Sequence, residues 1–194
     1  MKRRIFLAGL LVLGGLGLVK EAAASDKRGR GLQLFFAYRN VVTKFTPTGQ
    51  NGNLVTFAGA DLGTVEGVLS GTIIQNFTVT VDTTTGAATT GPDHALFTDL
   101  DRDQITFQYA GIGNFLPPSD LMSAGGSLTV TYTVLNASGK YKFLIGRQFL
   151  AEVVATNAVG GSSGALGCVY GEVYTSDVRS IERALSLPNQ LDEK

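Results

Sequence analysis

Polar residues interrupt several stretches of this chain that otherwise have the composition of β-strands. Four carry an amide or a phenol: Gln75, Asn76, Gln108 and Tyr132. Three carry a charge: Glu66, Arg147 and Glu172. If these side chains face a protein interior, we expect the first group to line a ligand-binding cavity. The second group is then the candidate catalytic set, because a buried carboxyl can transfer protons and a cation can stabilise negative charge on a reacting molecule. Alternation alone leaves open that they point outward into water.

The densest acidic cluster is Asp99, Asp101 and Asp103. Alternate aspartates offer oxygen ligands to a hard cation, so the cluster is a candidate calcium site. The usual calcium loop needs Gly at its sixth position and Glu at its twelfth, where this chain has Gln104 and Ala110. The alternative is a solvated hairpin turn in which aspartates accept hydrogen bonds from the backbone.

The chain has one histidine and one cysteine. His94 follows Gly91-Pro92-Asp93 and is expected at an exposed turn, although histidine is also the usual acid–base residue. Cys168 lies in an apolar strand-like run and is expected to be a small core side chain, with no disulfide inside the chain. One His and one Cys are too few soft ligands for zinc, and no cofactor-binding motif is found.

The N-terminus reads as an export signal over residues 1–25. Lys2, Arg3 and Arg4 precede a fifteen-residue apolar and glycine run, and small residues at 22–25 suit cleavage. The run is too short for a comfortable membrane span, which takes about 20 residues. Cleavage removes four of 16 basic and one of 16 acidic residues, leaving a net charge of −3. We therefore expect a secreted or periplasmic protein with no nucleic-acid partner, preceded by a flexible leader over 26–31.

The rest of the sequence indicates an all-β domain over 32–175. Eight strands are expected at 32–45, 52–60, 63–81, 87–100, 104–111, 126–135, 141–155 and 166–175. Clusters of Gly, Asn, Asp and Pro separate them, with a compact turn at Asn136–Gly139.

The 63–81 segment carries the strongest alternation. One parity runs from Val65 to Val81 and is apolar, while the other is mixed. A strand this long must coil, and Gly67 and Gly71 could allow a bend, so the pattern favours a closed antiparallel barrel. At the end of the chain, helical spacing from Val178 to Leu185 predicts a short helix within a C-terminal helix and tail over 176–194.

Several glycine-containing segments carry a family resemblance. They are Gly63-Thr-Val-Glu-Gly67, Gly71-Thr-Ile-Ile74, the Gly125–Tyr132 run, Asn136-Ala-Ser-Gly-Lys-Tyr141 and Leu144-Ile-Gly-Arg147. Together they resemble the secreted relatives of the allene oxide cyclase and dirigent barrels. The resemblance implies an eight-stranded antiparallel barrel and, as in many such barrels, a homo-oligomer. No catalytic residue of those families aligns with a matching motif.

Three functions remain in consideration. The first is an exported barrel that binds a small apolar or amphipathic ligand in its interior. The second is a cyclase or isomerase, or a dirigent-like activity, in the same barrel, and the third is a structural envelope protein with a filled barrel. A cavity of about 300 Å³ or more with inward polar groups would favour the first two.

Overall fold

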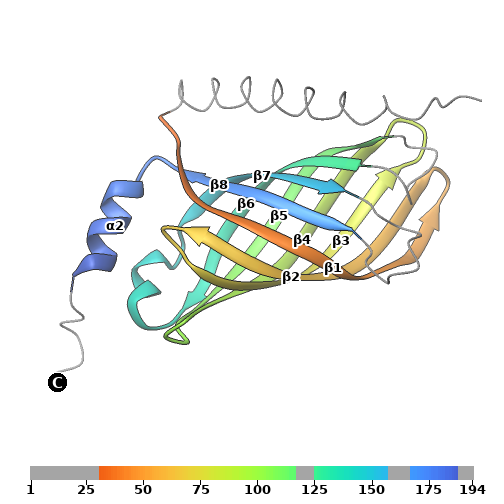
Figure 1. Cartoon of the computed structure of the whole chain (residues 1–194). Coiled ribbons are helices and arrows are strands. Elements are labelled where there is room, and N and C mark those ends of the chain that lie inside the picture. Colours follow the sequence, from red (N-terminus) through yellow and green to blue (C-terminus); the bar gives the residue numbers. More distant parts are fainter. Residues whose placement is uncertain (1–30, 117–124, 157–166, 188–194) are drawn as a thin grey trace, which may run out of the picture.

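A closed eight-stranded barrel makes up most of the molecule (Figure 1). The computed structural model describes residues 31–116, 125–156 and 167–187. The expected signal peptide at 1–25, all of the leader but Gly31, and the tail from 188 lie outside the described residues. No helix in the described ranges is long and apolar enough to cross a membrane.

Each strand pairs antiparallel with the next, and β1 pairs with β8 to close the sheet. The strands are β1 (Gln33–Asn51), β2 (Leu54–Gly67), β3 (Gly71–Asp82), β4 (Ala87–Asp99), β5 (Gln104–Leu116), β6 (Gly125–Ala137), β7 (Gln148–Thr156) and β8 (Cys168–Thr175). Closure leaves no exposed sheet edge along the paired segments. The expected all-β, eight-stranded antiparallel barrel with a C-terminal helix is confirmed.

The segment expected as one strand at 63–81 contains the end of β2, a turn and most of β3, and the expected strand at 52–60 forms the first part of β2. β2 runs through residues 61 and 62 to Gly67, and β3 begins at Gly71 after a turn at residues 68–70. Gly67 adopts a positive φ of 130°, and Leu69 in the turn is fully buried. The alternation continues through the turn, since Val65, Leu69 and Ile73 all face inward, and this continuity hid the break in the sequence.

The segment expected as a strand from 141 begins as a 3₁₀ helix. This helix, η1 (Gly139–Leu144), buries Tyr141 and Leu144, and β7 starts only at Gln148. Gly139 has a φ of 49°, which supports the turn geometry expected there. The link between β6 and β7 is therefore a structured connection rather than a compact hairpin turn.

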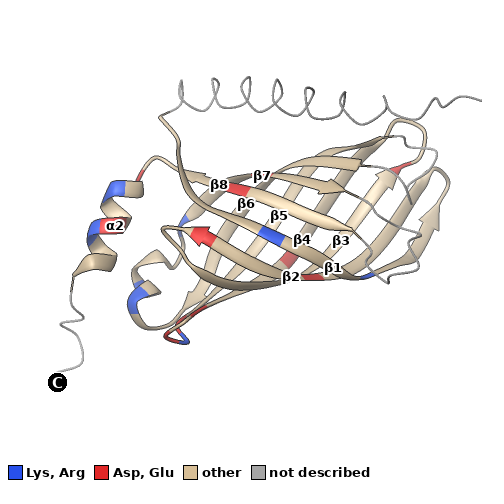
Figure 2. Cartoon of the chain, viewed as in Figure 1, with Lys and Arg blue, Asp and Glu red and all other residues tan. Residues whose placement is uncertain are grey.

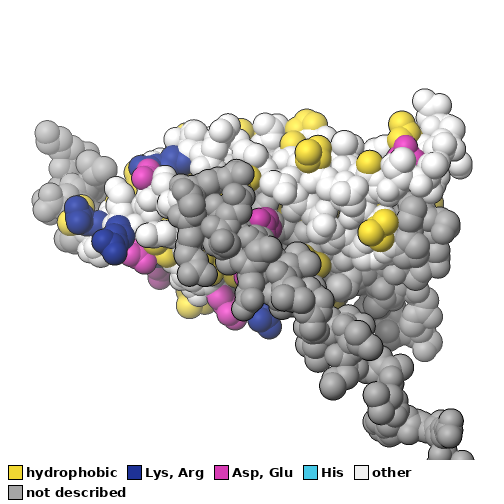
Figure 3. Space-filling model, turned by 90° about the horizontal axis from the view of Figure 1, so that it is seen from above, with side chains coloured by type: hydrophobic (Ala, Val, Ile, Leu, Met, Phe, Trp, Pro, Cys, Tyr) yellow, Lys and Arg dark blue, Asp and Glu magenta, His cyan; other side chains and the backbone are white. Residues whose placement is uncertain are grey.

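The helix α2 (Val178–Ser186) follows β8 and adds Val178 and Ile181 to the main core. Asp177 precedes it as the N-cap residue without a side-chain cap, and its carboxylate lies 3.4 Å from Arg147 Nη1. Figure 2 shows charged residues on α2, on η1 and at the β4–β5 turn, with few along the strands. On the face seen in Figure 3, hydrophobic side chains form separate spots and no continuous patch.

The interior is packed differently at its two ends. The main core cluster, which includes Phe35, Phe97, Ile105 and Leu144, fills the end where the β2–β3 and β4–β5 turns lie. A smaller cluster of Phe57, Val79, Val81, Ala88 and Phe115 lies toward the opposite end. A cavity occupies the space between the middle of the barrel and that second end.

Candidate functional site

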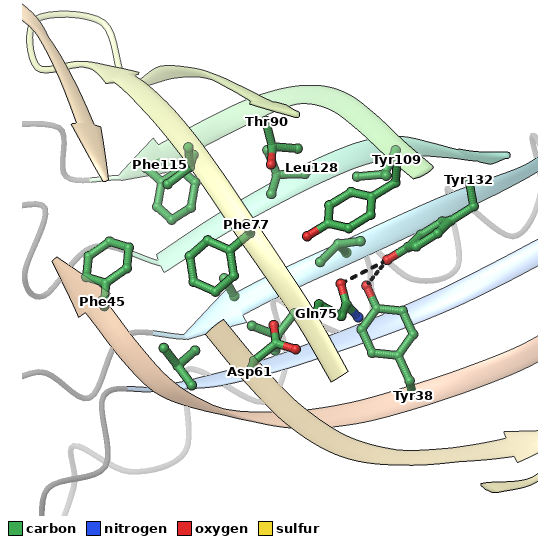
Figure 4. A pocket seen from close by; sticks show the side chains of 16 residues that line it. Tyr38, Phe45, Asp61, Gln75, Phe77, Thr90, Tyr109, Phe115, Leu128 and Tyr132 are labelled. Atoms are coloured by element: carbon green, nitrogen blue, oxygen red, sulfur yellow. Dashed lines mark hydrogen bonds between the residues drawn. The ribbon is translucent and has the colours of Figure 1, made fainter. Parts of the chain in front are cut away.

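The cavity encloses about 70 Å³ and is lined mainly by aromatic and aliphatic side chains. Its rings come from Tyr38, Phe45, Phe77, Tyr109, Phe115 and Tyr132 (Figure 4). Its polar side chains other than the phenols are Asp61, Gln75 and Thr90. The volume exceeds the 10–15 Å³, roughly, that one water needs, but it is well below the 300 Å³ or so that would by itself favour a ligand-binding or enzymatic barrel. The space therefore suits a small molecule, or one end of a larger molecule.

A chain of hydrogen bonds forms the polar part of the cavity. Tyr132 Oη lies 3.0 Å from Tyr38 Oη and donates to Gln75 Oε1 at 3.3 Å. Because the Tyr132 hydroxyl has a single proton, Tyr38 must be the donor in the first bond. Figure 4 shows these three side chains converging from different strands. Within the described part of the chain, Gln75 Nε2 is buried and has no hydrogen-bond partner.

The phenols of the cavity stay protonated at neutral pH. Burial raises the pKa of Tyr38 to about 12. Burial also raises the pKa of Tyr109 and of Tyr132 well above the ordinary value. Tyr109 donates to the backbone oxygen of Asn76 at 3.0 Å. These groups act in the cavity as neutral hydrogen-bonding groups and as aromatic surfaces.

Asp61 is the one carboxylic acid among the described cavity-lining residues, and it is 3 % exposed. Burial raises its pKa to about 7, against the opposing effect of the hydrogen bond that Asn40 Nδ2 donates to Asp61 Oδ1 at 2.5 Å. Asn40 Oδ1 has no partner within the described ranges. The described lining includes no Lys, Arg or His. Asp61 therefore changes charge near neutral pH without a protein cation beside it.

Glycines on the inner face make room for the rings. A Cβ on Gly171 would overlap the Tyr38 ring, and a Cβ on Gly59 would overlap the Phe77 ring. Phe77 lies across β2–β3 from Gly59 as its register partner. The placement of the aromatic lining thus depends on small residues on neighbouring strands.

The structure brings two of the four expected ligand-binding residues into the cavity. Gln75 and Tyr132 are buried there. Asn76 is exposed on the outer face, and Gln108 lies on the outer parity of β5, between the buried Phe107 and Tyr109.

The three candidate catalytic residues all lie outside the cavity. Glu66 is exposed on β2, and Arg147 lies beside Asp177 near α2. Glu172 is on the outer parity of β8 and accepts hydrogen bonds from Tyr170 and Tyr174. No carboxylate and cation therefore face each other among the described residues of the cavity wall.

The acidic cluster at the β4–β5 turn is organised around a lysine. Lys140 Nζ lies 2.7 Å from Asp99 Oδ2 and 2.8 Å from Asp101 Oδ2. Burial alone would raise the pKa of Asp99, but hydrogen bonds from Lys140, Tyr141 and the Asp103 amide lower it overall. Among the described residues, no three acidic, His or Cys side chains are placed to hold a metal ion. The cluster is better explained as a turn with backbone and lysine partners.

The two single-copy residues both lie at the surface. His94 is exposed, as expected, although it belongs to strand β4, where it pairs with Asn76 and Gln108 across the sheet. The expectation that Cys168 is a core residue is wrong, because its side chain is exposed at the start of β8. Successive residues of a strand face opposite sides of the sheet. Gly167 and Gly171 face the interior and are buried, so Cys168 lies on the outer face.

Sequence reasoning missed Tyr38, Asn40, Asp61 and Tyr109. Asp61 falls in the gap between the expected strands at 52–60 and 63–81, whereas β2 runs through it. A signal was present for Tyr38 and Asn40, which share parity with the apolar Phe36 and Val42 and are buried with them.

Comparison with known proteins bears on the fold alone and says nothing of function. No family model and no curated protein matches the chain. A crystal structure of a protein with unknown function from Clostridium acetobutylicum ATCC 824 is similar, with a TM-score of 0.50 and 16% identity. The match covers 74% of this chain and 96% of that one.

Proposed function

We propose that this chain is an exported barrel protein that binds one small apolar or amphipathic molecule in its interior cavity. Gln75 Nε2 carries the proposal: it is a buried donor without a partner among the described residues, on a side chain that lines the cavity. A buried donor left unpaired costs about 1–3 kcal/mol, and a ligand acceptor would remove that cost. Export rests on the charged, apolar and small-residue pattern of residues 1–25.

The lining supports an amphipathic occupant. Six aromatic rings and several aliphatic side chains offer apolar contact, while Asp61, Gln75 and the phenols supply a few polar groups near mid-barrel. This combination is typical of small-molecule sites. The volume of about 70 Å³ limits the buried part of the ligand to a small group of atoms.

The alternatives have less support. The candidate charge-steering residues of a cyclase or isomerase, Glu66, Arg147 and Glu172, lie outside the cavity. The kinship with allene oxide cyclase and dirigent barrels stays a prediction from sequence. A structural envelope protein would have a filled barrel, whereas this barrel holds a cavity lined by residues of both core clusters. Oligomerisation stays a prediction.

Native mass spectrometry of the protein purified from its own host tests the proposal. We expect a bound small molecule that dissociates on activation in the gas phase. Ala155→Leu, which fills the cavity wall, should abolish the bound mass, while Ala110→Leu, an exposed site on β5, should retain it. If the wild-type protein carries no small molecule, or if a folded Ala155→Leu variant keeps it, the proposal is wrong.

A further inference from the structure

We infer that the polar end of the bound molecule is an organic ammonium group that pairs with Asp61. The inference rests on the proposed ligand-binding function and specifies the chemical class of the ligand. Three features of the cavity carry it: an acid without a protein counter-ion, a wall of aromatic faces, and unmet acceptor capacity beside that acid.

The charge balance of the cavity is the first feature. Asp61 is 3 % exposed, and the described lining supplies no cation to it. Buried carboxylates in proteins are normally paired, because an isolated charge in an apolar medium is expensive. A ligand ammonium would supply the missing partner.

Aromatic faces are the second feature. Tyr38, Tyr109, Tyr132 and Phe77 contribute rings to the cavity wall around the inward-facing acid (Figure 4). Ring faces attract cations, and the attraction grows when the cation is desolvated. An anionic ligand would meet the same faces and Asp61 with no compensating positive group.

Acceptor capacity is the third feature. Asn40 donates to Asp61 Oδ1, which holds the carboxyl in place, and Asn40 Oδ1 is itself left without a partner within the described residues. Asp93 does not line the cavity, and its Oδ2 already accepts from Thr90 Oγ1 at 3.2 Å and from the Thr78 amide at 2.7 Å. The Asp61 carboxyl and the Asn40 oxygen favour a donor or a cation. Gln75 Nε2 is the exception, and a hydroxyl or carbonyl on the same ligand would accept from it.

The titratable groups that face Asp61 determine how binding depends on pH. They are the phenols of Tyr38 from β1, Tyr109 from β5 and Tyr132 from β6, all of which stay neutral. The carboxyl of Asp93 from β4 acts on Tyr109. Since burial raises the pKa of Asp61 to about 7, ammonium binding at about pH 6 should release a proton from it.

Calorimetric titration with three ligands of one chain length tests the inference. The probes are 1-hexylammonium, 1-hexanol and hexanoate, added to the full chain at about pH 8, where Asp61 is mostly ionised. We expect hexylammonium to bind more tightly than hexanol by roughly tenfold or more, and hexanoate to bind most weakly. At about pH 6, heats measured in two buffers of different ionisation enthalpy should reveal the released proton.

Asp61→Asn provides the decisive variant, because it keeps the shape and removes the charge. The preference for hexylammonium should disappear in it, whereas Glu66→Gln, which neutralises an exposed outer carboxylate, should bind like wild type. Equal or tighter binding of hexanol or hexanoate, or a preference that survives in Asp61→Asn, overturns the inference and leaves ligand binding intact. If none of the three binds, the proposed function fails and the inference fails with it.

Discussion

Asp61 on β2 is the direct register partner of Gln75 on β3, and both side chains are buried in the barrel. This pairing places a titratable acid beside a neutral amide whose Nε2 lacks a partner within the described residues. The two residues form the polar centre of an otherwise apolar cavity.

Stability should fall as pH rises through neutrality because of Asp61. Its folded-state pKa of about 7 lies above the ordinary 3.8, so its contribution is fully present below about pH 4 and lost as pH rises through 7. The size of the loss is about 4 kcal/mol. Chemical denaturation from about pH 4 to 8 should show that the free energy of unfolding decreases with pH in wild type and in Glu66→Gln. If it decreases equally in Asp61→Asn, Asp61 is not the cause.

Tyr132→Phe should destabilise the protein more than Tyr38→Phe. The Tyr132 hydroxyl accepts from Tyr38 and donates to Gln75, so its loss leaves two buried groups without their partner. We expect a cost of about 1–3 kcal/mol for Tyr132→Phe and about 1 kcal/mol for Tyr38→Phe. Urea titration measures both, and equal costs would argue against this order of donors.

Gly171→Ala should destabilise the barrel by overpacking. A Cβ at this buried position would overlap the Tyr38 ring, and the closed wall restricts relief. The expected cost is about 1–3 kcal/mol. Gly49→Ala is the matched control, because a Cβ there meets no atom within 4 Å. Thermal melts that show no difference between the two variants would refute the close packing.

Lys140→Met should weaken the turn between β4 and β5. It leaves the Asp99 carboxylate, whose side chain is 4% exposed, without its cation. A cost of about 2 kcal/mol is expected, because Lys140 itself is partly exposed. Lys142→Met, at an exposed position in η1, should change the free energy of unfolding by less than about 0.5 kcal/mol. A similar loss in both variants would show that Asp99 does not depend on Lys140.

Calcium should not stabilise the protein through Asp99, Asp101 and Asp103. Lys140 Nζ already contacts two of these carboxylates. Because a ligand that binds the folded state raises Tm, the melting temperature should be the same in excess calcium and in EDTA. A rise in Tm with calcium that is lost in Asp101→Asn would restore the calcium site.

The architecture could be predicted from sequence to a large extent. Alternation from Val65 to Val81 correctly identified the apolar inward face, including Ile73 and Val79. The C-terminal helix appears where the spacing from Val178 predicted it. Both features are local, because the alternation of a strand and the period of a helix depend only on residues that are close together in the sequence.

Element boundaries could not be fixed in the same way. The turn at residues 68–70 keeps the parity of both flanking strands, so alternation passes through it without a signal. Tyr141 and Leu144 look like strand residues but pack from η1, where the Tyr141 hydroxyl donates to Asp99 at 3.0 Å. That contact joins residues 42 positions apart, which no local pattern records.

The amino-acid sequence by itself determined a closed sheet with an apolar inner face, because apolar residues alternate with other residues in nearly every strand. Only the tertiary structure decided which polar groups meet. Tyr38, Asp61, Gln75 and Tyr132 come from four strands, and barrel closure and register bring them to one cavity while turning Glu66 and Glu172 outward. The physical reason is that a shift of one residue in register reverses every side chain, so the composition of the site depends on pairing across the barrel.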